Sequence, residues 1–214
     1  MTVVRPLLAG SELRAALGAT AAAALDDMVA EVAADPGRIA RTFPAAARRT
    51  ARGPVTGHDD VLAEDAVRVE LVGAAATALA PDALLAELRE LYRFGDNDEK
   101  RAVLHALNGT ADPEVDGSDL LLDALRTNDT RLVAAAMGPH SIRLTAEAWR
   151  HGVLKCLFTG VPVSAVAGLA DRADAELAAM VGRFAREREA AGRDVPPDVQ
   201  VVLDACQTDL AQEA

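Results

Sequence analysis

Two similar stretches decide the fold class of this chain: LRELYRFGDNDEKRAVLHAL at 88–107 and LLDALRTNDTRLVAAAM at 121–137. In each, a leucine-rich segment is followed by a polar turn that contains Asn and Asp, and then by Arg and a Val/Leu pair. Apolar residues spaced three and four apart predict helices, and a short turn between two helices predicts that they run antiparallel. The chain is therefore expected to consist of helical hairpins that stack in a HEAT-like manner.

The rest of the sequence shows the same helical period, and no stretch alternates as a half-buried strand does. Helices are predicted at 11–34 with Ser11 as N-cap, and then at 36–51, 60–79, 82–94, 98–107, 120–126, 130–137, 145–159, 171–191 and 198–210. The 60–79 helix has no charge after Glu70, which predicts that the other helices pack around it. We predict an all-α fold of about nine or ten helices in stacked antiparallel hairpins, one domain over 1–214, with 1–10 and 211–214 frayed.

The composition limits the class of protein. The chain has 22 basic and 33 acidic residues, which gives a formal net charge of −11. Nucleic acids and anionic membranes bind basic surfaces, so this charge argues against both as direct partners. The longest uncharged stretch, 156–170, contains glycine and proline and is shorter than the roughly 18 apolar residues of a membrane span. With two cysteines and no signal-peptide pattern, we expect a soluble cytoplasmic protein without direct membrane insertion.

The most polar segment, GDNDEKR at 95–101, has two interpretations. Asp96 followed three residues later by Glu99 matches a capping box, which would make the segment a helix start only. The alternative is that this turn and the Asn128-Asp129 turn of the next hairpin lie side by side. Their free backbone N–H groups would then line a groove that binds a polar head group. Neither turn contains a recognisable catalytic pairing.

The predicted helix at 145–159 carries further candidate binding residues. Trp149 is the only tryptophan, and its helical spacing to apolar neighbours predicts a core residue, the alternative being a ring that walls a pocket. Lys155 is one of two lysines, and an unpaired charge on this apolar helix is costly unless it reaches a partner or an opening. Lys155 is thus either tied to a carboxylate such as Asp96 or Asp129, or it contacts a ligand.

We expect any pocket where the two turns and this helix converge. The candidate ligand-binding residues are Phe94, Asp96, Asn97, Asp98, Asn128, Asp129, Arg131, Trp149 and Lys155. No residue is assigned to catalysis, a metal or a cofactor: the four histidines lack metal-ligand spacing, and Cys156 is expected to be buried and inert. The 112–123 segment partly matches a calcium loop, but Asp123 stands where the motif has glutamate, which favours an ordinary acidic loop.

Four blocks of the sequence follow one another in a characteristic order: GRIARTFPAAARR at 37–49, LYRFGDNDEKRAVLHAL at 91–107, LRTNDTRLVAAAMGP at 125–139 and AWRHGVLKCLFTGVP at 148–162. Together they resemble the EboA family of bacteria. The resemblance implies a small cytoplasmic protein encoded in a cluster with a UbiA-like prenyltransferase and a TatD-like hydrolase. It also implies a role in moving or maturing secondary metabolites, including export of precursors across the inner membrane. The family has no agreed catalytic residues, so only its signature polar segments carry over, at 94–101, 128–131 and 149–156.

Two functions of different classes follow. The first is a non-catalytic small-molecule-binding or adaptor protein in secondary-metabolite traffic. Its partners would be an unknown metabolite and proteins of the same gene cluster, including a membrane prenyltransferase. The alternative is an enzyme that acts on a small polar or isoprenoid-linked metabolite through Asp96, Asp98, Asp129 and His151. A capped and solvated Asp96 favours the binder, whereas a buried pair of aspartates facing a cavity favours the enzyme.

The fold class can be tested on the purified chain. We expect a far-ultraviolet circular dichroism spectrum dominated by helix, because neither the periodicity nor the alanine-rich composition provides for a sheet. A spectrum with substantial strand content would contradict the all-α prediction.

Overall fold

The computed structural model describes residues 2–212, with side chains as far as Gln207. Within residues 2–212 it contains eleven α-helices and one sheet of two short strands, which confirms the all-α prediction. None of these helices is long and apolar enough to cross a membrane. The contacts between residues divide the chain into two compact units, Met1–Leu120 and Leu121–Ala214, with the boundary inside one helix. The expectation of one domain over the whole chain stays a prediction.

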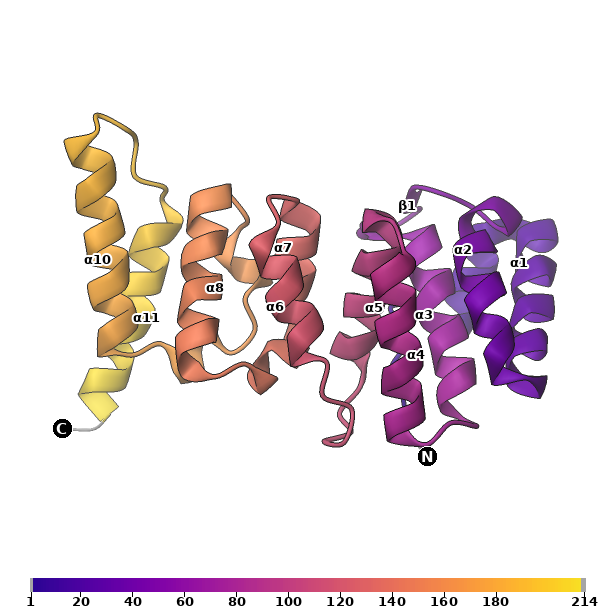
Figure 1. Cartoon of the computed structure of the whole chain (residues 1–214). Helices are drawn as coiled ribbons and strands as arrows, with labels where there is room; N and C mark the ends of the chain where they lie inside the picture. The colour runs from indigo at the N-terminus through magenta and orange to yellow at the C-terminus, as the bar shows by residue number, and fades with distance from the viewer. Residues whose placement is uncertain (1, 213–214) are drawn as a thin grey trace. The chain divides into compact units, whose positions relative to one another are not determined.

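The first unit is organised around one helix. Its elements are α1 (Gly10–Ala34), a 3₁₀ helix (Pro36–Arg38), α2 (Ile39–Arg49), β1 (Pro54–Val55), β2 (His58–Leu62), α3 (Ala63–Ala76), α4 (Pro81–Phe94), α5 (Asn97–Gly109) and the start of α6 (Ser118–Arg126). α3 packs against α1, α2, α4 and α5, and Figure 1 shows it between α5 and α2. Eleven of its 14 residues are buried. For this unit, the predicted central helix is confirmed.

The start of two helices differs from the sequence prediction. Ser11 is not the N-cap of α1, because the helix starts one residue earlier and Glu12 accepts a hydrogen bond from the Ala9 N–H at 3.3 Å. Residues 60–62, predicted as the start of the central helix, belong to β2, which pairs antiparallel with β1. Gly53, just before β1, and Gly57, in the turn between the two strands, adopt positive φ angles of 97° and 84°. They allow the chain to reverse into a hairpin before α3 begins.

An ion pair inside the first unit joins α3 to α5. The side chains of Asp65 and Arg101 are 3% and 5% exposed, and they share two hydrogen bonds, at 2.6 and 3.1 Å. Arg101 also contacts Asp98 at 2.9 Å. Burial, the largest single effect, lowers the pKa of Arg101, but the hydrogen bonds that Arg101 donates to Asp65 and Asp98 and the negative charges of these two aspartates together raise it above its ordinary value. Arg101 therefore remains charged in the core.

The start of the chain is held against the first unit, although the sequence predicts that residues 1–10 fray. Val4 forms a β-bridge with Thr110, and the Thr2 hydroxyl donates to the Asp112 carboxylate at 2.7 Å. Through these contacts Thr2 and Val4 are paired with residues of the first unit, as in an ordered segment. The last two residues of the chain, also expected to fray, lie outside the described part.

The second unit is wholly helical in its described part. Its elements are the rest of α6, α7 (Thr130–Ala136), a 3₁₀ helix (Pro139–Arg143), α8 (Ala146–Thr159), a 3₁₀ helix (Val163–Ala165), α9 (Leu169–Arg172), α10 (Ala175–Ala190) and α11 (Asp198–Gln212). α8 packs against α7 and α10, and α10 lies alongside α11 (Figure 1). The predicted helix at 171–191 is interrupted, because Asp174 caps α10 by accepting the Leu177 N–H at 2.9 Å.

The two hairpins that decided the fold class are present as helices. α4 and α5 pack together around the turn at 95–96, and α6 and α7 flank a turn at 127–129, within two residues of the predicted bounds. This confirms two helices in each of the similar stretches. HEAT-like stacking, which requires a regular array of such pairs, stays a prediction.

Removing the carboxylate of the buried ion pair should destabilise the first unit strongly. In Asp65→Ala, Arg101 keeps only its contact to Asp98, and we expect unfolding to become easier by about 3–5 kcal/mol. The matched control is Asp119→Ala, which breaks the exposed pair of Asp119 with Arg89, whose side chains are 53% and 47% exposed. That control should lose at most about 1 kcal/mol. Urea unfolding of both variants measures the difference, and equal losses would show that the buried pair is not structural.

Candidate functional site

The candidate residues are divided between the two units. The first unit contains Phe94, Asp96, Asn97 and Asp98, and the second contains Asn128, Asp129, Arg131, Trp149 and Lys155. Convergence of both groups on one pocket therefore stays a prediction. The contacts inside each unit show what each group does locally.

The polar turn between α4 and α5 forms a helix start. Asp96 Oδ1 accepts the Glu99 N–H at 2.9 Å and Glu99 Oε2 accepts the Asp96 N–H at 3.2 Å, which is the predicted capping box. Asp98 pairs with Arg101, and Asn97 is the exposed first residue of α5. Asp96 is thus exposed and capped, the arrangement that favours a binder over an enzyme.

Phe94 borders a small pocket between α2 and α4. Its side chain is 75% exposed. The pocket has a volume of about 200 Å³ and is lined by Ala40, Phe43, Pro44, Glu87, Glu90, Leu91, Phe94, Gly95 and Glu99. Its charged lining residues are all glutamates, and it is smaller than the roughly 300 Å³ at which most small-molecule sites begin.

Lys155 and Asn128 come together in the second unit. Lys155 Nζ donates to Asn128 Oδ1 at 2.8 Å, which links α8 to the turn between α6 and α7. Lys155 forms no ion pair among the described side chains. The alternative of a tie to Asp129 is therefore wrong, because Asp129 caps α7 and pairs with Arg131 at 2.9 Å. The tie to Asp96, which lies in the first unit, stays a prediction.

An open groove lies beside Lys155, between α8 and α10. We call it the α8–α10 groove; it has a volume of about 410 Å³ and is lined by His151, Leu154, Lys155, Phe158, Met180, Arg183, Phe184 and Glu187. Half of these residues are apolar, and Phe158 is 65% exposed. An ion pair joins the two walls, since Arg150 of α8 donates from Nε to Asp174 Oδ1, at the start of α10, at 3.0 Å. The hydrogen bond from Arg150 lowers the pKa of Asp174.

Trp149 is a core residue, as its spacing predicts. Its side chain is buried, and the guanidinium of Arg172 lies 4.8 Å from the centre of its ring. Arg172 is held there by the carbonyl oxygens of Ser141 and Leu144, each at 2.9 Å. The indole Nε1 has no hydrogen-bond partner among the described residues. Trp149 therefore supports the packing of α8 and does not line the α8–α10 groove.

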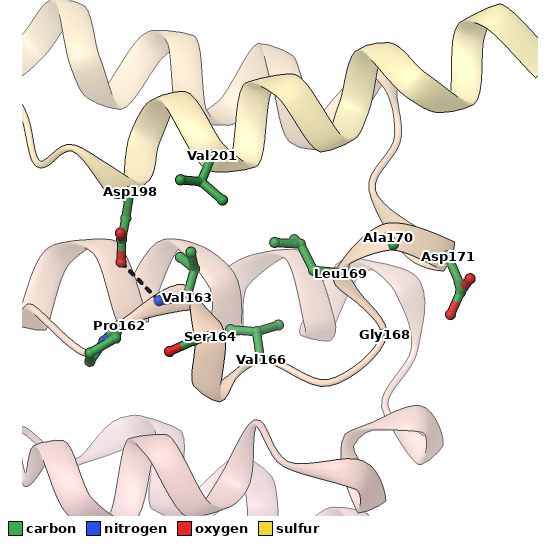
Figure 2. Close-up of a pocket in the computed structure, with 10 residues that line it drawn as sticks. All are labelled: Pro162, Val163, Ser164, Val166, Gly168, Leu169, Ala170, Asp171, Asp198 and Val201. Carbon is green, nitrogen blue, oxygen red and sulfur yellow. Dashed lines mark hydrogen bonds between the residues drawn. The ribbon is translucent and has the colours of Figure 1, made fainter.

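A second cleft of this unit lies between the 163–171 segment and α11. It has a volume of about 500 Å³ and is lined by Pro162, Val163, Ser164, Val166, Gly168, Leu169, Ala170, Asp171, Asp198 and Val201. Figure 2 shows Val163, Leu169 and Val201 facing the space between the two segments. Asp198 accepts the Val163 N–H at 2.8 Å, so this carboxylate fixes the loop to α11. The lining is mainly aliphatic and contains no basic side chain.

The remaining candidates for chemistry are engaged by the fold. No group of three or more His, Cys, Asp or Glu side chains could hold a metal in the described part of the chain. In the acidic loop before α6, Asp112 and Asp116 each accept the backbone N–H two residues on, at 3.0 Å, as turn residues do. Burial raises the pKa of the Cys156 thiol to about 12, which agrees with the prediction of a buried, inert cysteine.

Sequence reasoning missed the groove wall contributed by α10. None of the four α10 residues that line the groove was singled out as a binding residue from the sequence: Met180, Arg183, Phe184 and Glu187. The available signal was their spacing, because positions three, four and seven apart lie on one side of a helix. An apolar pair interleaved with charges marks the edge of a packed face.

Sequence reasoning also missed the buried charges of the first unit. Asp65, Arg68 and Arg101 are all buried, and none was singled out. The signal was position: Asp65 and Arg68 lie on the helix predicted to be central, and charges in a core must be paired.

The comparisons with known proteins cover most of the second unit and about half of the first. No curated protein and no solved structure matches the chain. The family model described as "Metabolite traffic protein EboA" matches residues 58–204. This match includes α3 to α10, the turns at 95–96 and 127–129, and the whole α8–α10 groove. Since it covers well over half of the 214 residues, the chain belongs to the EboA family.

Proposed function

We propose that this protein is a non-catalytic small-molecule-binding protein in metabolite traffic, and that the α8–α10 groove is its binding site. Membership of a family described by metabolite traffic supports the first part. The assignment of the groove as the binding site rests on Lys155. Its ammonium is held by the amide oxygen of Asn128, has no ion pair among the described side chains, and borders a groove of the size of small-molecule sites.

The contacts of the candidate acids support a binder over an enzyme. A general acid or base must face its substrate and exchange a proton with it. Asp96 instead caps α5, Asp98 pairs with an arginine of α5, and Asp129 pairs with Arg131. His151 is the one candidate of this group that lines the groove, and its Nδ1 lies 2.9 Å from the Glu147 carbonyl oxygen.

The finer parts of the function come from the family resemblance. We propose that the protein works in the cytoplasm, that its ligand is a secondary metabolite or a precursor of one, and that it also acts as an adaptor. Its protein partners are then products of the same gene cluster, including a membrane prenyltransferase. The net charge of −11 supports proteins rather than nucleic acids as macromolecular partners.

Replacing Lys155 should impair traffic without unfolding the protein. Lys155→Met removes the charge and keeps the chain length, so we expect metabolite export from producing cells to fall roughly tenfold, as loss of one charge-assisted hydrogen bond predicts. The melting temperature should change by no more than about 2 °C. The control is Lys100→Met, which removes the other lysine, placed 5.0 Å from the ring centre of Tyr92 in the first unit.

Lys100→Met should leave export unchanged. Normal export by Lys155→Met would exclude the α8–α10 groove as the working site. A large drop in its melting temperature would assign Lys155 to the scaffold, and the binding proposal for this groove would then be wrong.

A further inference from the structure

We infer that the α8–α10 groove selects an amphipathic anion: a molecule with an apolar body and one carboxylate or phosphate monoester. This inference rests on the proposed function, because it names the chemical class of the ligand for the same groove. It follows from the apolar surface of the groove, from the charges around it and from the way its walls are held.

The groove offers apolar surface that the fold leaves open. Leu154 and Phe158 of α8 face Met180 and Phe184 of α10 across it. Phe158 is among the most exposed large apolar side chains of the described residues, at 65%. Covering such surface with an apolar molecule is favourable in proportion to the area removed from water, and methionine adapts its shape to the molecule that covers it. The ligand must therefore have an apolar body.

The charges around the groove leave one cation uncompensated. Arg183 Nη2 lies 3.3 Å from Glu176, so its charge is partly neutralised by its own helix. Glu187 is the single carboxylate of the lining. Lys155 bonds to the neutral amide of Asn128 and to no carboxylate among the described side chains. A positive charge at one end of an apolar groove matches a negative charge at one end of an apolar ligand.

The geometry at Lys155 leaves donors for that negative group. An ammonium carries three N–H donors, and Asn128 accepts one of them at 2.8 Å. The remaining donors can form charge-assisted bonds, which are stronger than neutral ones, with carboxylate or phosphate oxygens. A neutral apolar ligand would cover the ammonium without compensating it, and an organic cation would be repelled.

The groove is held ready for binding. Arg150 and Asp174 fix α8 to the start of α10, and Asn128 fixes the ammonium of Lys155 from a third element. Little ordering is then needed when a ligand binds, which favours affinity.

Two fluorescent probes with similar apolar bodies test the inference on the full chain. Anilinonaphthalene sulfonate carries an anionic group, and N-phenylnaphthylamine lacks it. We expect Lys155→Met to weaken binding of the sulfonate roughly tenfold and to leave binding of the neutral probe within about twofold. Lys100→Met should change neither, and Phe158→Ser should weaken both. Equal weakening of both probes by Lys155→Met, or no weakening of the sulfonate, would overturn the assignment of Lys155 as the anion contact.

Competition against the bound sulfonate compares ligands with either anionic group with a ligand of the opposite charge. Dodecanoate and dodecyl phosphate should displace the probe, inorganic phosphate should not, and dodecylammonium should be at least roughly tenfold weaker than either anion. Displacement by inorganic phosphate would show a simple anion site, and equal displacement by dodecylammonium would show apolar binding alone. Either result would overturn the inference.

The outcome also separates the ligand class from the proposed function. If Lys155→Met lowers metabolite export but leaves sulfonate binding unchanged, the groove takes part in traffic and the ligand class is wrong. If the sulfonate binds as expected and export is normal, the groove binds amphipathic anions and the proposed role of this groove in traffic is wrong.

Discussion

The ion pair of Asp65 with Arg101 is the contact on which the packing of the first unit depends. α3 is almost wholly buried, yet its first two turns carry three charged side chains, and an unpaired charge in a core is prohibitively costly. Each of them has a partner from a different element: Asp65 pairs with Arg101 of α5, Glu64 accepts the Gly53 N–H at 2.8 Å, and Arg68 donates to a backbone carbonyl of α2. The polar half of α3 therefore sets how the hairpin, α2 and α5 surround it.

The helices were predictable because their signals are local. Apolar spacing, proline, glycine and polar turns lie within a few residues of the structure they determine. The errors occur where the structure depends on distant partners. Residues 58–62 contain two aspartates and resemble a helix start, but they pair with β1 across the turn. At the break before α10, Asp174 caps the helix and also pairs with Arg150, which lies 24 residues earlier in the chain.

The candidate site was predictable in part, for the same reason. The scarcity of lysine marked Lys155, and apolar residues at helical spacing identified its helix. Its partner was not predictable, because Asn128 and Asp129 are adjacent and either could have faced it. The structure uses Asp129 to cap α7, through the Arg131 N–H at 3.0 Å, and the side chain of Asn128 reaches Lys155. A neutral amide thus occupies the place where a carboxylate would have cancelled the charge.

Because the partner of Lys155 is the neutral amide of Asn128 and not a carboxylate, an acidic protein can still select an anion at this groove. The net charge of −11 repels anions at long range, but salt at physiological concentration screens such forces beyond about 8 Å. Close to Lys155 the local charge and the apolar groove dominate. The binding free energy from one ammonium is too small to hold a small inorganic anion. A ligand with an apolar body gains binding free energy from the ammonium and from the apolar surface of the groove. One charge in an open groove also permits release, as the proposed role in metabolite traffic requires.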